Sequence, residues 1–273
     1  MLIAAFWSGD GAFEGTMLRS VFLALATASV AMLVFDFRDM VQRAYEDGVD
    51  TERTEPVIME PPKDTDTETQ KERPYFPKAV PVAPNSGPPQ MPGHERTTAK
   101  MVGQPMTFTI NDAGDVSAVG RIEPGTGRSF DEFLAKSDGK AKRVWLHSTG
   151  GSLSDALAMG RAIRKAKLST IVPENAYCAS SCPLVLAGGV EREAGRKAWI
   201  GVHQVYTLPS QVGTLQEGLA HAQQISANCQ EYLTTMGVDP RAWIPAMKTA
   251  KNKLYVFTPK ELVEFKLVTK AAG

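Results

Sequence analysis

Residues 143–172 read RVWLHSTGGSLSDALAMGRAIRKAKLSTIV, and this stretch decides the fold class. It opens with a short apolar strand, Arg143 to Leu146, which leads into a Gly-Gly pair. Apolar residues then recur at helical spacing while basic residues take the opposite side, a pattern typical of an amphipathic helix. The next strand is Ser169 to Val172. A strand, a helix and a strand in this order indicate an α/β domain with a largely parallel sheet.

The chain from residue 101 onward continues this alternation. Two strands, Met106 to Ile110 and Val116 to Ile122, are expected to form a hairpin around turn residues. The further expected elements are a helix opening at a capping box over 129–132, a buried helix over 182–189, a strand over 198–202, an amphipathic helix over 215–236, a strand over 255–257 and a helix opening at Thr258. Residues 101–273 therefore suit one α/β domain with one core.

The first hundred residues have a different character. Within residues 1–44, Met17 to Phe37 holds sixteen consecutive uncharged residues and approaches the ~20 residues that cross a bilayer. This stretch predicts a retained membrane anchor; a cleaved secretory signal, with a small-x-small site at residues 29–31, and a soluble amphipathic helix are the alternatives. Residues 45–100 are acidic and then proline-rich, with ten of the 18 prolines between Pro56 and Pro92. That composition is typical of an extended, disordered linker.

The overall composition excludes several classes of protein. The 30 basic side chains are balanced by 30 acidic ones, so no nucleic-acid partner is expected. The 43% of hydrophobic residues exclude wholesale disorder and a polytopic membrane protein. The three cysteines can form at most one disulfide and lack the paired CxxC spacing of a structural zinc site. We expect no metal and no cofactor.

Three strand ends carry groups suited to acyl transfer. Gly150-Gly151 lets a backbone approach a substrate without a Cβ and leaves peptide N–H groups for an acyl oxygen. Ser180 follows a predicted strand and precedes a predicted buried helix. A serine needs a base to become a good nucleophile, and His203 at the end of the next strand is the best placed histidine. These residues predict an acyl-transfer site.

The same three segments resemble the signature blocks of the Clp-protease proteolytic subunit. The matching blocks are residues 146–152, residues 176–189 and His203-Gln204, in the same order and at similar intervals. The resemblance covers most of residues 144–268 and implies the crotonase-like ββα superhelix and peptide-bond hydrolysis. It also implies Ser180 as nucleophile, His203 as general base, and the N–H groups of Gly151 and Ser181 as oxyanion hole.

The chain departs from this family at the third catalytic position. The family carries an aspartate roughly ten residues before its C-terminal helix, where this chain reads MKTAKN. Asn252 could orient the histidine, Asp239 could reach in from the preceding turn, or the site could be a dyad. Lys248 or Lys251 could instead act as base, as in related Ser–Lys enzymes. A second departure is His147, where the family tends to carry asparagine.

The cysteines are compatible with four arrangements. Cys178 and Cys182 flank Ser180, and Cys229 lies on the apolar face of the predicted long helix. They could be three buried thiols, or Cys229 could form a disulfide with one of the pair. Cys178, Cys182 and His203 could instead bind zinc, or one cysteine could be a nucleophile.

These features together predict a membrane-tethered serine peptidase. Its folded domain is expected outside the cytoplasm, in the periplasm, with polypeptides as substrates; a cleaved, secreted form is the alternative. A catalytically silent member that serves as an assembly or binding module, and a crotonase-type acyl-CoA enzyme, are the alternative functions. Because members of the family assemble into rings, the resemblance also implies a homo-oligomer, in which residues 215–236 could join the subunits.

Overall fold

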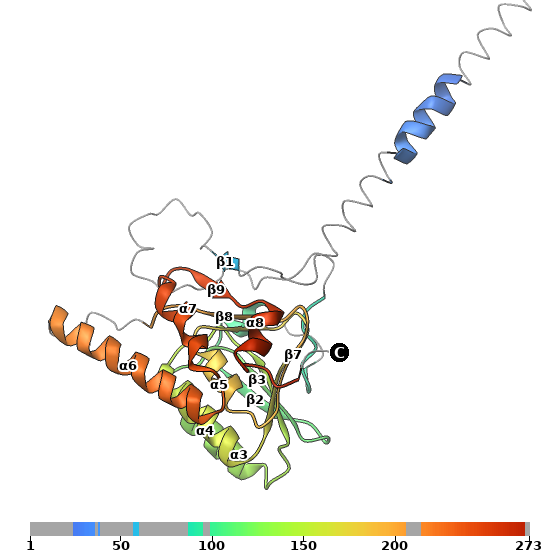
Figure 1. Cartoon of the computed structure of the whole chain (residues 1–273). Coiled ribbons are helices and arrows are strands. Elements are labelled where there is room, and N and C mark those ends of the chain that lie inside the picture. The colour runs from blue at the N-terminus through green and yellow to red at the C-terminus, as the bar shows by residue number, and fades with distance from the viewer. Residues whose placement is uncertain are drawn as a thin grey trace, which may run out of the picture. The chain divides into compact units, whose positions relative to one another are not determined.

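The computed structural model of the chain describes residues 24–35, 38, 57–59, 87–94, 99–205 and 214–270 (Figure 1). The chain divides into two compact units, Met1–Asp50 and Thr51–Gly273. All the predicted site residues lie in the second unit.

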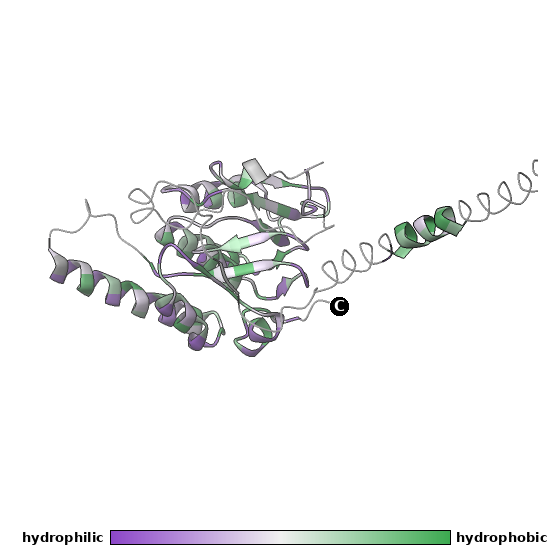
Figure 2. Cartoon of the chain, turned by 90° about the horizontal axis from the view of Figure 1, so that it is seen from above, coloured by the Kyte–Doolittle hydropathy of each residue, from purple (hydrophilic) through white to green (hydrophobic). Residues whose placement is uncertain are grey.

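Residues 24–35 of the first unit form a helix whose colour in Figure 2 is largely hydrophobic, and most of its large apolar side chains are exposed. No helix in the described parts of the chain is long and apolar enough to cross a membrane. The other residues of the expected anchor, 17–23 and 36–37, lie outside the described residues. The anchor therefore stays a prediction.

The second unit begins inside the segment expected to be a linker. There the structure describes β1 (Val57–Met59), residues 87–94 and the start of α2 (Ala99–Val102). β1 pairs antiparallel with β9 (Leu254–Val256), almost 200 positions further along the chain. Met91 is buried. The rest of residues 45–100 lies outside the described residues.

Two sheets form the second unit. The five-stranded sheet has the order β2 (Thr107–Ile110), β3 (Asp115–Val119), β4 (Arg143–His147), β5 (Ser169–Val172), β7 (Arg192–Ala194). β2 and β3 form the predicted hairpin, and β3, β4, β5 and β7 run parallel. The four-stranded sheet has the order β1, β9, β8 (Trp199–Val202), β6 (Tyr177–Ala179), with β6 and β8 parallel. The predicted α/β class with a largely parallel sheet is confirmed.

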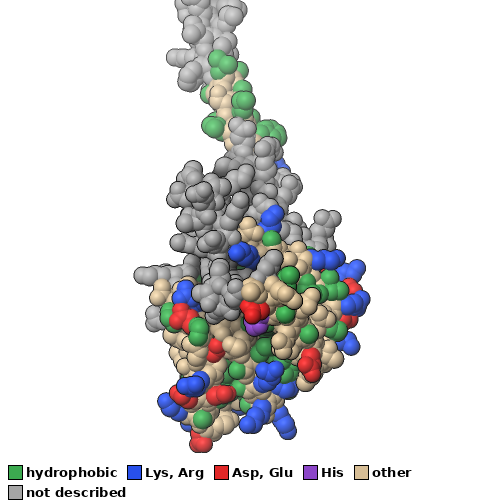
Figure 3. Space-filling view, turned by 90° about the vertical axis from the view of Figure 1, so that its left-hand side faces the viewer, with side chains coloured by type: hydrophobic (Ala, Val, Ile, Leu, Met, Phe, Trp, Pro, Cys, Tyr) green, Lys and Arg blue, Asp and Glu red, His purple; other side chains and the backbone are tan. Residues whose placement is uncertain are grey.

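Helices pack around these sheets (Figure 1). They are α3 (Thr126–Lys136), α4 (Leu153–Lys165), α5 (Cys182–Ala187), α6 (Leu215–Thr235), the short 3-10 helix η2 (Pro240–Ala242), α7 (Trp243–Lys248) and α8 (Pro259–Glu264). α4 packs between α3 and α5, and its buried face contains Ala156, Met159 and Ile163. The apolar spacing that predicted this helix therefore marks the face turned toward the core. On the face of the molecule drawn in Figure 3, the side chains of Lys and Arg are interspersed with those of Asp and Glu.

The start of α3 differs from the prediction. The capping box over 129–132 lies inside the helix, which already begins after Gly125. One carboxylate oxygen of Asp155, on α4, accepts hydrogen bonds from the N–H groups of Gly125 and Gly127, each at 2.9 Å. These bonds satisfy donors that a helix start otherwise leaves unpaired. Because Asp155 lies 30 positions from Gly125, the local sequence does not reveal this cap.

Candidate functional site

Ser180 lies at the turn between β6 and α5 with a backbone φ of +61°. A left-handed conformation costs a non-glycine residue about 1–3 kcal/mol and persists only where the surroundings impose it. The Ser180 N–H donates to the Gly201 carbonyl of β8 at 2.9 Å, which holds one side of the turn. The expected position of Ser180 between a strand and a buried helix is confirmed.

The Gly150-Gly151 pair brings the β4–α4 loop against this turn. A Cβ on Gly150 would lie 2.4 Å from the Ala179 carbonyl oxygen and 2.7 Å from Ser180 Cβ. A Cβ on Gly151 would lie 2.0 Å from the Ile122 carbonyl oxygen. Both glycines also have positive φ, +83° and +141°. Only glycine fits either position, so the pair serves the close backbone approach that the sequence indicated.

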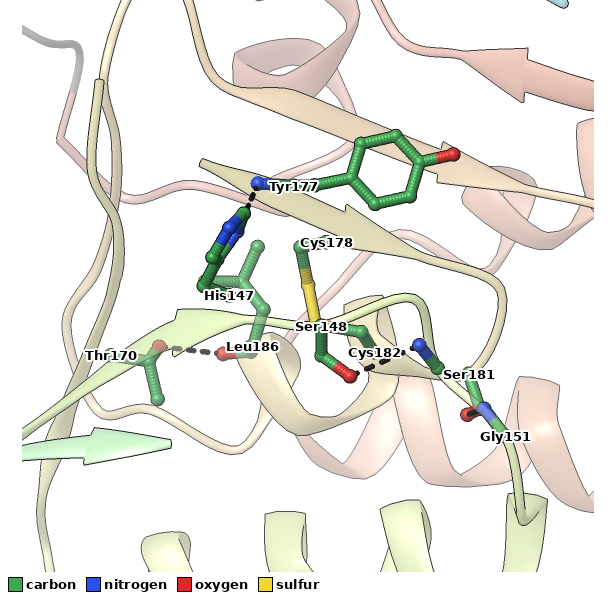
Figure 4. The surroundings of a disulfide bond; sticks show 10 residues. His147, Ser148, Gly151, Thr170, Tyr177, Cys178, Ser181, Cys182 and Leu186 are labelled. Atoms are coloured by element: carbon green, nitrogen blue, oxygen red, sulfur yellow. Dashed lines mark hydrogen bonds between the residues drawn. A yellow bond between two sulfur atoms is a disulfide. The ribbon is translucent and has the colours of Figure 1, made fainter. Parts of the chain in front are cut away.

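The N–H of Gly151, one of the two implied oxyanion donors, already has a partner. It donates to the Ser181 hydroxyl at 2.9 Å (Figure 4). The backbone nitrogen of Ser181, the other implied donor, lies 2.8 Å from the place that a Gly150 Cβ would occupy. The two donors are thus on adjoining segments. A substrate oxygen at Gly151 would have to displace the Ser181 hydroxyl.

His203 follows β8 and is buried, with 5% of its surface exposed. Its Nδ1 lies 2.9 Å from the Gln204 carbonyl oxygen. Because a carbonyl oxygen only accepts, Nδ1 carries the proton in this contact and Nε2 carries the lone pair. Burial lowers the pKa of His203 below its usual 6.5, although the carbonyl contact opposes this shift. His203 is therefore a neutral imidazole at neutral pH.

Gln204 is itself fixed by the segment that reads MKTAKN. The Gln204 N–H donates to the Thr249 carbonyl, and its side-chain amide donates to the Met247 carbonyl, both at 2.8 Å. The family that the chain resembles carries an aspartate in this segment. Here, instead, the carbonyls of Met247 and Thr249 hold Gln204, and the carbonyl of Gln204 contacts His203. Because these contacts are made by main-chain carbonyls, the residue types in the sequence could not predict them.

One cavity of about 780 Å³ brings the predicted residues together. Gly151, Ser180, Ser181 and His203 all line it, although they come from three separate segments of the chain. The rest of the wall includes apolar side chains and two polar ones on α6: Ile122, Leu153, Leu157, Ile225, Trp243, His221 and Asn228. Sequence reasoning missed this second set because its members belong to no motif that marks them as part of a site.

The residues considered for the third catalytic position lie elsewhere. Asp239 caps η2, and its two carboxylate oxygens accept hydrogen bonds from the backbone N–H and the guanidinium of Arg241. Asn252 lies in the turn before β9. The described residues that line the cavity do not include Asp239, Asn252, Lys248 or Lys251.

Two of the four arrangements are wrong: the three cysteines are not all free thiols, and Cys229 does not pair with Cys178 or Cys182. Cys178 and Cys182 are bonded to each other, with Cα atoms 5.2 Å apart, and Cys229 is a buried free thiol on α6. The turn at Ser180 folds β6 back onto the first residue of α5, which makes neighbours of residues four positions apart. Because both sulfurs are bonded, neither acts as a zinc ligand or as a nucleophile in this state. Burial raises the pKa of Cys229 to about 12, which keeps that thiol protonated.

His147 joins the two sheets. It is buried on β4, and its Nδ1 accepts a hydrogen bond from the Tyr177 N–H of β6 at 2.9 Å (Figure 4). Next to it, Ser148 N–H donates to the Tyr177 carbonyl and Ala179 N–H donates to the Ser148 carbonyl. Burial lowers the pKa of His147 to about 4, so the ring is neutral. This histidine positions the strand that precedes Ser180.

Comparison with known proteins adds a partial likeness. No family model matches the chain, and no curated protein matches it. Among solved structures, a mutant of ClpP1 from Listeria monocytogenes is similar, with 11% sequence identity and a TM-score of 0.46; the match covers 57% of this chain and 90% of that one.

Proposed function

We propose that this chain is a serine hydrolase that cleaves peptide bonds with Ser180 as nucleophile and His203 as general base. The single observation that carries the proposal is the convergence of Ser180, His203 and Gly151 on one cavity of about 780 Å³. A cavity of this size can hold several residues of an extended polypeptide. The signature blocks in the sequence point to the same chemistry.

The state of His203 supports its role. A general base must be unprotonated at the working pH, and burial lowers the pKa of His203. The Gln204 carbonyl, which accepts from Nδ1 at 2.9 Å, selects the tautomer in which Nε2 can take a proton. In serine hydrolases the third residue chiefly holds the histidine in that tautomer and orientation. Here a main-chain carbonyl supplies that hold in place of a carboxylate.

The proposed reaction proceeds by acyl transfer. The Ser180 hydroxyl attacks the substrate carbonyl carbon while His203 takes its proton, and the carbonyl oxygen becomes an oxyanion. The N–H groups of Gly151 and Ser181 stabilise this oxyanion; each such donor contributes typically about 3 kcal/mol to the transition state. His203 then protonates the leaving amine, and water releases the acyl group by the reverse sequence of proton transfers.

The proposal also includes the location of the folded domain, which we place outside the cytoplasm. A structural disulfide persists in an oxidising compartment, so the Cys178–Cys182 bond favours a domain outside the cytoplasm. The expected membrane anchor would keep this domain at the membrane. We propose exported or membrane-associated polypeptides as substrates.

Fluorophosphonate labelling of the full chain tests the activity. Labelling is expected for the wild type and for Ser154→Ala, which removes another serine of the same cavity. It should be lost in Ser180→Ala and in His203→Ala. Hydrolysis of an unfolded protein substrate should follow the same order. A folded wild type that neither labels nor hydrolyses substrate would favour the catalytically silent module instead.

A further inference from the structure

The turn that carries Ser180 is closed by a covalent bond. Four extended residues reach about 13 Å, whereas the Cα atoms of Cys178 and Cys182 are 5.2 Å apart. The chain therefore reverses between them, and Ser180, with its φ of +61°, is the midpoint of this reversal. The disulfide joins the residue two positions before the proposed nucleophile to the residue two positions after it.

Both ends of the bond are fixed in the core. Cys178 pairs with Ile200 of β8 on one side and with Ser148 on the other. Cys182 begins α5, every residue of which is buried. The disulfide thus connects an immobilised strand to an immobilised helix, which leaves the turn at Ser180 little room to relax.

The other restraints on the turn are non-covalent, and they include the hydrogen bonds from the Ala179 N–H to the Ser148 carbonyl and from the Gly151 N–H to the Ser181 hydroxyl. The Ser180 N–H has one hydrogen bond, to Gly201, and the Gly150 backbone packs against the turn. A non-glycine residue leaves a left-handed conformation readily unless its neighbours prevent it. Two thiols at these positions would also separate to a van der Waals distance, which pushes β6 and α5 apart at the base of the turn.

We propose that the Cys178–Cys182 disulfide is a positioning element of the site, which holds Ser180 in its reactive backbone conformation. This inference rests on the proposed function. A dithiol reductant would open the bond: two electrons pass from the dithiol to the disulfide, the Cys178–Cys182 S–S bond breaks, both sulfurs take up protons, and the dithiol becomes a cyclic disulfide. The reactivity of Ser180 would fall while the domain stays folded.

A double variant, Cys178→Ala with Cys182→Ala, tests this in the full chain without any need for reductant to reach buried sulfurs. The matched control is Cys229→Ala, which removes a buried thiol that has no disulfide. We expect the second-order rate of fluorophosphonate labelling to fall about 10- to 100-fold in the double variant, as for other misplacements of a reacting group by about 1 Å. The control should label within about twofold of the wild type, since it lies outside the turn.

Hydrogen exchange provides a readout that general destabilisation does not mimic. The Ser180 amide, bonded to Gly201, should lose protection in the double variant, while the Thr170 amide, bonded to Glu191 in the five-stranded sheet, keeps its protection. Loss of protection at both amides to the same extent would point to a purely structural role and overturn the proposal.

Two further outcomes separate the inference from the proposed function. A folded double variant with wild-type labelling and wild-type protection of Ser180 overturns the positioning role. A wild type that never labels overturns the proposed activity, and the exchange comparison still decides whether the disulfide holds the turn. Should the double variant not fold, the wild type treated with dithiothreitol and then reoxidised provides the same comparison, with loss and recovery of both signals expected.

Discussion

Replacing Ser181 by alanine should make Ser180 more reactive. The Ser181 hydroxyl accepts the hydrogen bond of the Gly151 N–H at 2.9 Å, so a substrate oxyanion must compete for that donor. A neutral hydrogen bond of this kind contributes about 0.5–1.5 kcal/mol. Its removal leaves the Gly151 donor unpaired in the free enzyme and available in the transition state. Since about 1.36 kcal/mol corresponds to a tenfold change in rate, we expect an increase of about 2- to 10-fold.

The assay is the second-order rate of fluorophosphonate labelling of the full chain at neutral pH, with urea unfolding of the same samples. Ser154→Ala is the control, because its hydroxyl lies near that of Ser152 and not at the Gly151 N–H. A folded Ser181→Ala protein that labels about tenfold more slowly than the wild type would refute the reasoning. In that case the hydroxyl assists the transition state instead of blocking the donor.

Three other predictions concern the same region. Gly150→Ala should reduce labelling by at least about tenfold, because the new Cβ would meet the Ala179 carbonyl oxygen at 2.4 Å and displace the turn; unchanged labelling would contradict the close approach. The labelling rate should rise with pH and level off before neutral pH, because only the neutral imidazole of His203 accepts a proton and burial lowers its pKa below 6.5. A midpoint of this rise above about pH 7 would contradict the lowering of the pKa by burial. Acidification should destabilise the fold through His147, whose native pKa of about 4 lies below its ordinary 6.5. The contribution of neutral His147 to the free energy of unfolding is complete above pH 6.5 and is lost as the pH falls from there to about 4, a change of about 3 kcal/mol. Urea unfolding at about pH 7 and about pH 4.5 measures the loss, which should be smaller in a folded His147→Gln variant.

The sequence predicted where the candidate residues lie between strands and helices when that position depends on neighbouring residues. Ser180 and Gly150-Gly151 could be placed because a strand pattern precedes each of them and a helix pattern follows. Glycines at strand ends signal a close approach even when the approaching segment is unknown. The two segments lie side by side, as the closeness of Gly150 to the Ala179 carbonyl requires.

The group that contacts His203 could not be predicted from residue type. Asn252 and Asp239 were the candidate side chains, whereas the group 2.9 Å from His203 Nδ1 is the main-chain carbonyl of Gln204. Every residue has such a carbonyl, so its use leaves no trace in residue type. The Cys178–Cys182 disulfide was missed because the sequence does not show that the chain reverses at Ser180, which brings residues four positions apart together.

The sequence by itself determined the alternation of strands and helices, the cap at Thr258, and the residue types available for acyl transfer, because hydrophobic period and cap chemistry act within a few residues. Only the tertiary structure decided that Asp155 caps α3, that β1 pairs with β9 and that the Ser181 hydroxyl occupies the Gly151 donor. Each of these contacts joins groups at least 28 positions apart. The partners in these contacts are selected by packing and by the need to satisfy buried polar groups. Both depend on the folded domain and cannot be read from residues that are close in the sequence.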